Sequence, residues 1–196
     1  MNKHNTQWPR FEVFKQDTAK KRHQAVGSVH APDAEVALLE ARNVFVRRPR
    51  AISLWVAPAN AIYSMTKQEL EKDPSWHMEE IPASSARETY QIFRKSSQRR
   101  SMTFVDHIGV VSAQSAKQAL CQAIERFNDK PAWVWWVVPE EAISRSHEDD
   151  FESWFAPALT KTYRHQSGAG SRNRTRQKKK KEYADKDGHK NKISSD

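Results

Sequence analysis

Residues 26–45 read VGSVHAPDAEVALLEARNVF, and residues 108–127 read IGVVSAQSAKQALCQAIERF. The two stretches share a glycine in second place, several small residues and a final phenylalanine, all at a constant offset of 82 residues. Self-similarity at a fixed separation is the signature of a repeated structural unit. The sequence therefore predicts two copies of one small fold within the 196 residues of the chain.

The second part of each stretch predicts an amphipathic helix. In the first copy, Ala, Ala, Leu, Ala and Phe occupy positions 34, 37, 38, 41 and 45, which places them on one helical face. The second copy has the same residue types at 116, 119, 120, 123 and 127. Asp33 and Ser115 stand just before these stripes, where a side-chain oxygen can cap free N–H groups, and Gln118 is a capping-box partner for Ser115.

Three strands are predicted in each copy, two before the helix as a hairpin and one after it. The third strand is rich in β-branched and aromatic residues and ends at a proline, so it is predicted to be central in its sheet. The predicted strands are 11–14, 25–29 and 52–56 in the first copy and 90–93, 107–111 and 133–138 in the second. A short helix is expected after each third strand.

The predicted fold class is α+β, with two tandem β-β-α-β(-α) repeats. One helix covers only one face of a small sheet, so the copies are expected to pack together as a pseudo-twofold intramolecular dimer. We place the first repeat at 8–83 and the second, more divergent repeat at 84–166. Residues 1–7 are predicted to be a flexible N-terminus.

The positive charge of the chain is concentrated in its last thirty residues. Residues 167–196 hold ten lysines and arginines against four acidic residues, so this segment carries +6 of the net charge of +9. It has few apolar side chains to offset the entropy of ordering, and it is predicted to be a disordered basic tail. The remainder, at +3, has no electrostatic footprint typical of a nucleic-acid-binding protein.

The cysteine content and hydropathy indicate a cytoplasmic protein. Cys121 is the single cysteine, which fits a reducing compartment and leaves no internal disulfide. The N-terminus is polar, and the longest apolar run, 132–138, is far shorter than the roughly 20 residues that cross a bilayer. We therefore expect neither a signal peptide nor a membrane partner.

Blocks of the first copy, in the same order and spacing, resemble the B-subunit family of phenylacetyl-CoA epoxidase. These blocks are residues 8–14, 26–33, 37–42, 47–48 and 53–56. The second copy keeps the apolar skeleton but has GVVSA at 109–113 in place of the Gly-Ser-x-His-Ala block, and residues 161–165 resemble the C-terminal block of the family. The chain thus resembles a tandem duplicated member.

The resemblance implies a non-catalytic accessory and assembly subunit of a multicomponent di-iron monooxygenase that epoxidises the ring of phenylacetyl-CoA. It implies no cofactor in this chain, because the di-iron, flavin and iron–sulfur centres are expected in partner subunits. The expected partners are the catalytic and structural subunits of the oxygenase, and self-association with a second copy is left open.

The residue types agree with that implication. None of the eight histidines has a glutamate three residues before it, as the Glu-x-x-His motif of di-iron helices requires. One cysteine cannot supply the usual ligands of an iron–sulfur cluster or a zinc site. No glycine-rich phosphate loop or G-x-S-x-G elbow is present. No catalytic, cofactor-binding or metal-ligating residue is therefore assigned.

Candidate partner-interface residues are large aromatics, which often anchor protein interfaces, and arginines near the end of the first helix. They are Arg42, Arg47, Arg48, Trp76, Trp135 and Trp154. The competing interpretation is that about half of the tryptophans are buried, and Trp135 and Trp136 must face opposite sides of a strand. His30 and Cys121 are interpreted as structural.

The alternative function is a tandem RNA- or DNA-binding module that uses the basic tail and exposed aromatics. The predicted strands lack the aromatic and basic runs of RNP-type modules, so nucleic acid is the less favoured partner. The acidic runs, Glu140-Glu141 and 148–150, are interpreted as solvated surface.

Overall fold

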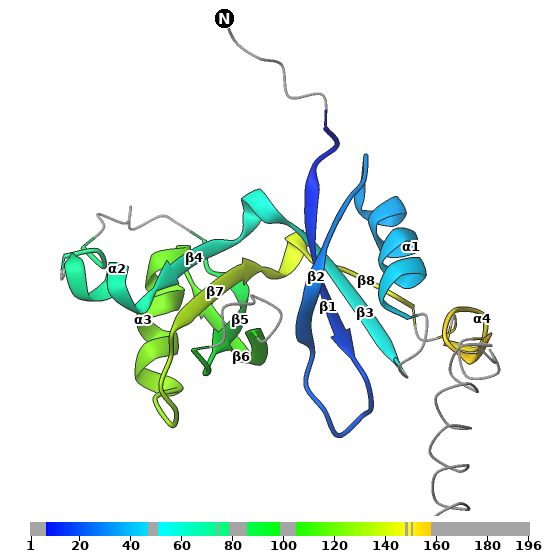
Figure 1. Cartoon of the computed structure of the whole chain (residues 1–196). Coiled ribbons are helices and arrows are strands. Elements are labelled where there is room, and N and C mark those ends of the chain that lie inside the picture. The colour runs from blue at the N-terminus through cyan, green and yellow to red at the C-terminus, as the bar shows by residue number, and fades with distance from the viewer. Residues whose placement is uncertain are drawn as a thin grey trace, which may run out of the picture. The chain divides into compact units, whose positions relative to one another are not determined.

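The computed structural model describes residues 7–46, 51–73, 75–78, 86–98, 105–147, 149 and 151–157 (Figure 1). The chain divides into two units, residues 1–159 and 160–196. All described residues belong to the first unit. The predicted disordered tail at 167–196 and nearly all of the flexible N-terminus lie outside the described residues.

Within the described residues, each half contains four strands and one long helix. The first half contains β1 (Arg10–Gln16), β2 (Gln24–His30), α1 (Ala34–Phe45), β3 (Ser53–Pro58), the 3₁₀ turn η1 (Ala59–Ala61), β4 (Tyr63–Thr66) and α2 (Lys67–Lys72). The second half contains β5 (Glu88–Lys95), β6 (Val105–Ala113), α3 (Ala116–Arg126), β7 (Val134–Pro139), the 3₁₀ turn η2 (Glu140–Ala142), β8 (Ser144–Arg145) and α4 (Phe151–Trp154).

The strands form one antiparallel sheet in the order β4-β7-β5-β6-β2-β1-β3-β8. Equivalent strands of the two halves stand at equivalent distances from the middle, where β2 meets β6. The last strand of each half pairs with the third strand of the other half, so β4 lies beside β7 and β8 lies beside β3 (Figure 1). We call this arrangement the strand exchange.

The α+β class, the two hairpins and the interior positions of β3 and β7 are confirmed. The predicted strand count was wrong, because a fourth strand follows the 3₁₀ turn in each half. Tyr63–Thr66 forms β4, and Ser144–Arg145 forms β8. Each of these strands has its hydrogen-bonding partner in the other half, so no pattern within one repeat marks it.

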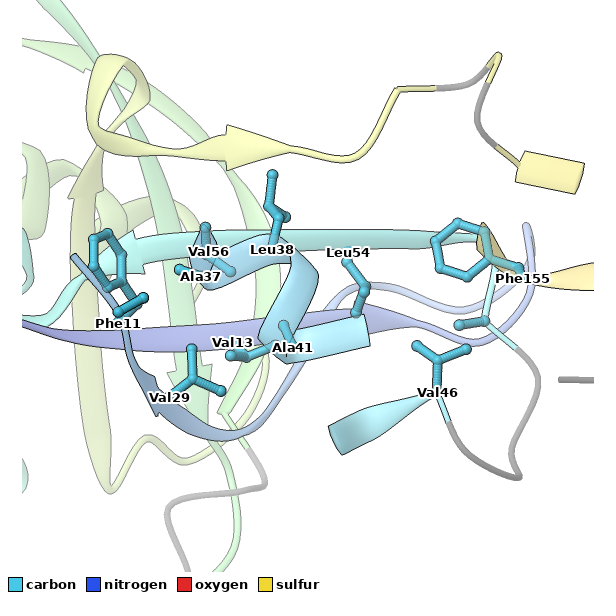
Figure 2. Packing of buried hydrophobic residues seen from close by; sticks show 12 residues of the cluster. Phe11, Val13, Val29, Ala37, Leu38, Ala41, Val46, Leu54, Val56 and Phe155 are labelled. Carbon is cyan, nitrogen blue, oxygen red and sulfur yellow. The ribbon is translucent and has the colours of Figure 1, made fainter. Parts of the chain in front are cut away.

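The buried residues gather in three clusters. Under α1, Ala37, Leu38 and Ala41 pack on β1 and β3, as Figure 2 shows, and Phe155 joins them just after α4. A corresponding cluster lies under α3. The third cluster joins the two halves, and its centre is the stacked pair Phe14 and Phe93, with ring centroids 4.2 Å apart. Each half thus buries one sheet face under its own helix and the other against its neighbour.

The same irregularity occurs in both hairpins. Pairing shifts between Val13 and Phe14 in β1 and between Ile92 and Phe93 in β5, which are equivalent positions. The strand opposite carries Gly27 in one half and Gly109 in the other. A Cβ on Gly109 would lie 2.5 Å from the Phe127 ring, and a Cβ on Gly27 would lie 2.9 Å from the ring of Phe45. The helix-terminal phenylalanine therefore needs the glycine beneath it.

Both predicted helix caps are present. The Asp33 carboxylate accepts from the N–H of Val36 at 2.8 Å, and the Ser115 hydroxyl accepts from the N–H of Gln118 at 3.2 Å. The Gln118 amide oxygen accepts from the N–H of Gln114, one residue earlier than the capping box requires. Among the described residues, no helix has the length and apolar character needed to cross a membrane.

Candidate functional site

The strand exchange creates two equivalent sites where the halves meet. In one, Arg145 of β8 lies opposite Trp55 of β3. In the other, Ser64 of β4 lies opposite Trp136 of β7. The 3₁₀ turn before each exchanged strand begins with Glu140 in the first case and with Ala59 in the second. We call these the filled site and the open site, because large side chains occupy one and small side chains leave a cavity at the other.

The filled site is a continuous polar network. The Arg145 guanidinium lies 4.6 Å from the centroid of the Trp55 ring and donates to a Glu140 carboxylate oxygen at 2.6 Å. The second Glu140 oxygen accepts from the Gln91 amide. The Gln91 amide oxygen lies 2.5 Å from Nε2 of His107. The Glu140 side chain is 38% exposed and Glu141 is exposed, as expected for surface residues, but the pairing of Glu140 with Gln91 and Arg145 was not predicted.

Two histidines complete the filled site. His23 stacks on Trp55 with centroids 3.6 Å apart, and its Nε2 lies 3.0 Å from the Ser53 hydroxyl. Burial, with smaller effects from His107 and Arg145, lowers the pKa of His23 to about 3. Burial, followed by the nearby Arg22, lowers the pKa of His107 to about 4. Both imidazoles are neutral at physiological pH, so they serve here as buried aromatic and hydrogen-bonding groups.

The open site is a cavity of about 410 Å³. Trp136, Gly27, Ala59 and Ser64 are among its lining residues. Glu12 supplies a carboxylate whose side chain is only 15% exposed, and burial raises its pKa despite the nearby Arg10. Arg10 Nε lies 3.2 Å from Oε1 of Glu12, while the Arg10 side chain as a whole is 56% exposed.

The four sequence-predicted interface residues that the structure describes do not converge on either site. Arg42 and Trp154 contact one another: the guanidinium donates to the carbonyls of Ser153 and Trp154 and lies 5.9 Å from the Trp154 ring centroid. Trp76 is half-buried beside the α3 cluster. Trp135 is 4% exposed and packs under α3, beneath the Arg94 guanidinium. Trp135 and Trp136 face opposite sides of β7, as predicted, and both are buried.

Arg47 and Arg48 lie outside the described residues. Their role as partner contacts, like that of the other four residues, stays a prediction.

The residues interpreted as structural have ordinary surroundings. Nδ1 of His30 lies 2.9 Å from the Trp8 carbonyl, which ties the start of β1 to the end of β2. Burial, with the nearby Glu125, raises the pKa of the half-buried Cys121 thiol, so the thiol is protonated at neutral pH. Among the described residues, no group of three or more His, Cys, Asp or Glu side chains could hold a metal ion.

Sequence reasoning missed both sites, although one signal was available. Alignment of the copies after the third strand, at an offset of 81 residues, matches Ala59 with Glu140 and Ser64 with Arg145. This comparison shows small residues in one copy where the other carries a complementary charged pair.

Comparison with known proteins gives a consistent result for both halves. The family described as "Phenylacetic acid degradation B" matches residues 7–77 and again residues 87–176. The B subunit of 1,2-phenylacetyl-CoA epoxidase from Escherichia coli (strain K12) is 38% identical over 65 residues, which are 33% of this chain and 68% of that protein. No solved structure matches the chain.

Proposed function

The chain belongs to the phenylacetic acid degradation B family, and from this premise we propose that it is a non-catalytic accessory and assembly subunit of an oxygenase that epoxidises the ring of phenylacetyl-CoA. The proposal has three parts: the chain organises partner subunits, it works in the cytoplasm, and the di-iron, flavin and iron–sulfur chemistry belongs to those partners.

The observation that carries the proposal is the double family match, one in each half of a single sheet. We infer that the halves act as a pseudo-twofold intramolecular dimer. The symmetrical strand order and the shared Phe14–Phe93 core support this arrangement. Such a unit presents two related, rigid surfaces, which suits a protein that holds other subunits in a fixed geometry.

The chemistry of the filled site is consistent with a structural role. A general acid or base works best with a pKa near the operating pH, whereas the pKa values of His23 and His107 lie at about 3 and about 4. Their ring atoms stack on Trp55 or contact Ser53 and Gln91. The His107 ring also lies 5.4 Å from the Trp55 ring of the other half, so both imidazoles are part of the packing around Trp55.

The test is reconstitution of the oxygenase with its reductase, with and without this chain. We expect stable co-elution of the oxygenase subunits with the chain, no phenylacetyl-CoA-dependent NADPH oxidation by the chain alone, and at least tenfold faster oxidation when it completes the mixture. Turnover by the chain alone, or full activity of the other components without it, would refute the accessory role. Salt-sensitive co-purification of nucleic acid without oxygenase subunits would favour the alternative binding module.

A further inference from the structure

The open and filled sites differ in which groups the chain itself supplies. Both contain a tryptophan and a carboxylate: Trp55 and Glu140 in the filled site, and Trp136, which is 6% exposed, and Glu12 in the open site. The carboxylates come from different positions, because the counterpart of Glu12 in the second half is the neutral Gln91. Of the two exchanged strands, β8 supplies an arginine to its site and β4 supplies a serine.

The open site lacks the large side chains that occupy the equivalent positions of the filled site. Arg145 extends from β8 over Trp55, and the equivalent residue of β4, Ser64, stands opposite Trp136 with a side chain too short to reach the ring in the same way. Ala59 likewise replaces Glu140. The space left by these two truncations is the cavity of about 410 Å³, which is within the range of specific ligand pockets.

The Glu12 carboxylate is the group of the open site that can pair with a cation, and Arg10 balances its formal charge. The Glu12 side chain is largely buried, and desolvation disfavours its ionised form, so a second positive group beside it would be stabilised. Among the described residues, the cation that contacts Glu12 is Arg10, through a single Nε–Oε1 pair, and Arg10 is mostly solvated at the rim. The other lining residues of the cavity are neutral: Gly27, Ser28, Ala59, Ile62, Ser64 and Trp136.

We propose that the open site binds an arginine side chain presented by a partner protein, with its guanidinium in the cavity, against the exposed part of Trp136 and beside Glu12. Arg145 over Trp55 is the internal precedent for this arrangement. Arginine fits better than lysine, because a planar guanidinium stacks on an indole and can donate two parallel hydrogen bonds to a carboxylate. Arginine is also common among the residues that dominate binding energy at protein interfaces.

The inference deepens the proposed function and rests on it only for the identity of the partner as an oxygenase subunit. The site itself can be tested on the chain alone. The probe is N-acetyl-L-arginine methylamide, with the lysine analogue as control, titrated into the full chain labelled with ¹⁵N. The indole N–H signals of tryptophan and the amide signals around Ser64 report binding.

We expect a saturable shift in the millimolar range for the arginine probe and at least fivefold weaker binding of the lysine probe. Glu12→Gln should weaken arginine binding at least fivefold. The double variant Ala59→Glu/Ser64→Arg copies the filled site and should abolish the shift, while its folding is checked by thermal denaturation. The matched variant Glu140→Ala/Arg145→Ser opens the filled site but leaves the neutral Gln91 in place of a carboxylate, so it should give no second saturable event near Trp55.

Three results would overturn the inference: no saturable shift with the folded wild-type chain, equal binding of the two probes, or unchanged binding after Glu12→Gln.

Capture of the oxygenase subunits then tests the partner. We expect Ala59→Glu/Ser64→Arg to reduce capture at least tenfold and Glu140→Ala/Arg145→Ser to leave it unchanged. If the wild type and Ala59→Glu/Ser64→Arg capture the subunits equally, the partner does not bind this site through an arginine. The proposed function would still stand. If the wild type captures none, the proposed function fails, and the probe titration still decides whether the site binds arginine.

Discussion

The filled and open sites are the same place in two copies of one fold, yet one is a closed polar network and the other is a cavity. The backbone is equivalent in both: a third strand ending in proline, a 3₁₀ turn and a strand that crosses to the other half. Two positions account for the main difference, since Glu140 and Arg145 replace Ala59 and Ser64. The two halves thus share one framework, while the side chains at the junction differ.

The largest expected loss of stability comes from the Phe14–Phe93 stack, to which each half contributes one ring. Phe14 and Phe93 are fully buried and stack on one another, so replacing either with alanine should cost about 3–5 kcal/mol of unfolding free energy. Because both rings fill one space, the double variant should cost less than the sum of the two single variants. Urea denaturation measures all three. An effect confined to one half would show that the halves do not share a core.

The second effect tests the glycines under the helix-terminal phenylalanines. Gly109→Ala would place a Cβ 2.5 Å from the Phe127 ring, and the displaced ring should cost roughly 2–3 kcal/mol. Gly27→Ala meets the Phe45 ring at 2.9 Å and adds an unfavourable φ of +143°. We expect similar losses in the two halves by thermal denaturation. The control is to truncate the ring as well: Phe127→Leu should recover part of the loss in Gly109→Ala and none in Gly27→Ala.

The third prediction is that stability depends on pH through His23 and His107, which lie in the filled site and not in the open site. His23 and His107 have folded pKa values of about 3 and about 4, below the ordinary value of 6.5. At a pH between the folded and the ordinary values, the unfolded chain therefore binds more protons than the folded chain. Stability should be complete above pH 6.5 and fall as the pH drops toward 4, by on the order of 1–2 kcal/mol per histidine between pH 7 and pH 5. Urea midpoints over this range provide the measurement.

The matched variants are His107→Gln, which should remove about half of this pH dependence, and Asp33→Ala, which lies outside the filled site and should retain it. A wild-type midpoint that does not change between pH 7 and pH 5 would contradict the burial of these imidazoles.

The smallest effect compares the two helix caps. Asp33→Ala and Ser115→Ala each remove a side-chain acceptor for a helix N–H, and each should cost about 1 kcal/mol. The loss at Ser115 is expected to be the smaller one, because its bond is longer and Gln118 also satisfies the N–H of Gln114. Thermal denaturation of the two variants in parallel gives the comparison, and a larger loss at Ser115 would contradict it.

The sequence predicted the parts of the fold that are encoded within one repeat. The helical stripe at 34, 37, 38, 41 and 45 matches the buried face of α1, and Asp33 caps it because local hydrogen bonding depends on nearby residues. β4 and β8 were not predicted, because each pairs with a strand that is distant in the sequence. β8 has two residues, and its pairing with β3 is determined by contacts between residues some ninety positions apart.

The candidate sites were less predictable than the fold. A tryptophan in a strand indicates burial, but nothing local indicates that Arg145 stacks on Trp55 while Trp136 faces a cavity. The partners of Glu140 could not be predicted, because Gln91 and Arg145 are brought to it by tertiary structure.

The strand exchange also bears on how such a protein can evolve. In an assembly of two identical chains, symmetry forces both junctions to carry the same side chains, so a substitution that improves one necessarily alters the other. A single polypeptide that contains both halves is free of that constraint. One junction can then specialise in recognition while its twin secures the architecture, and a mutation in either is inherited without a matching change elsewhere.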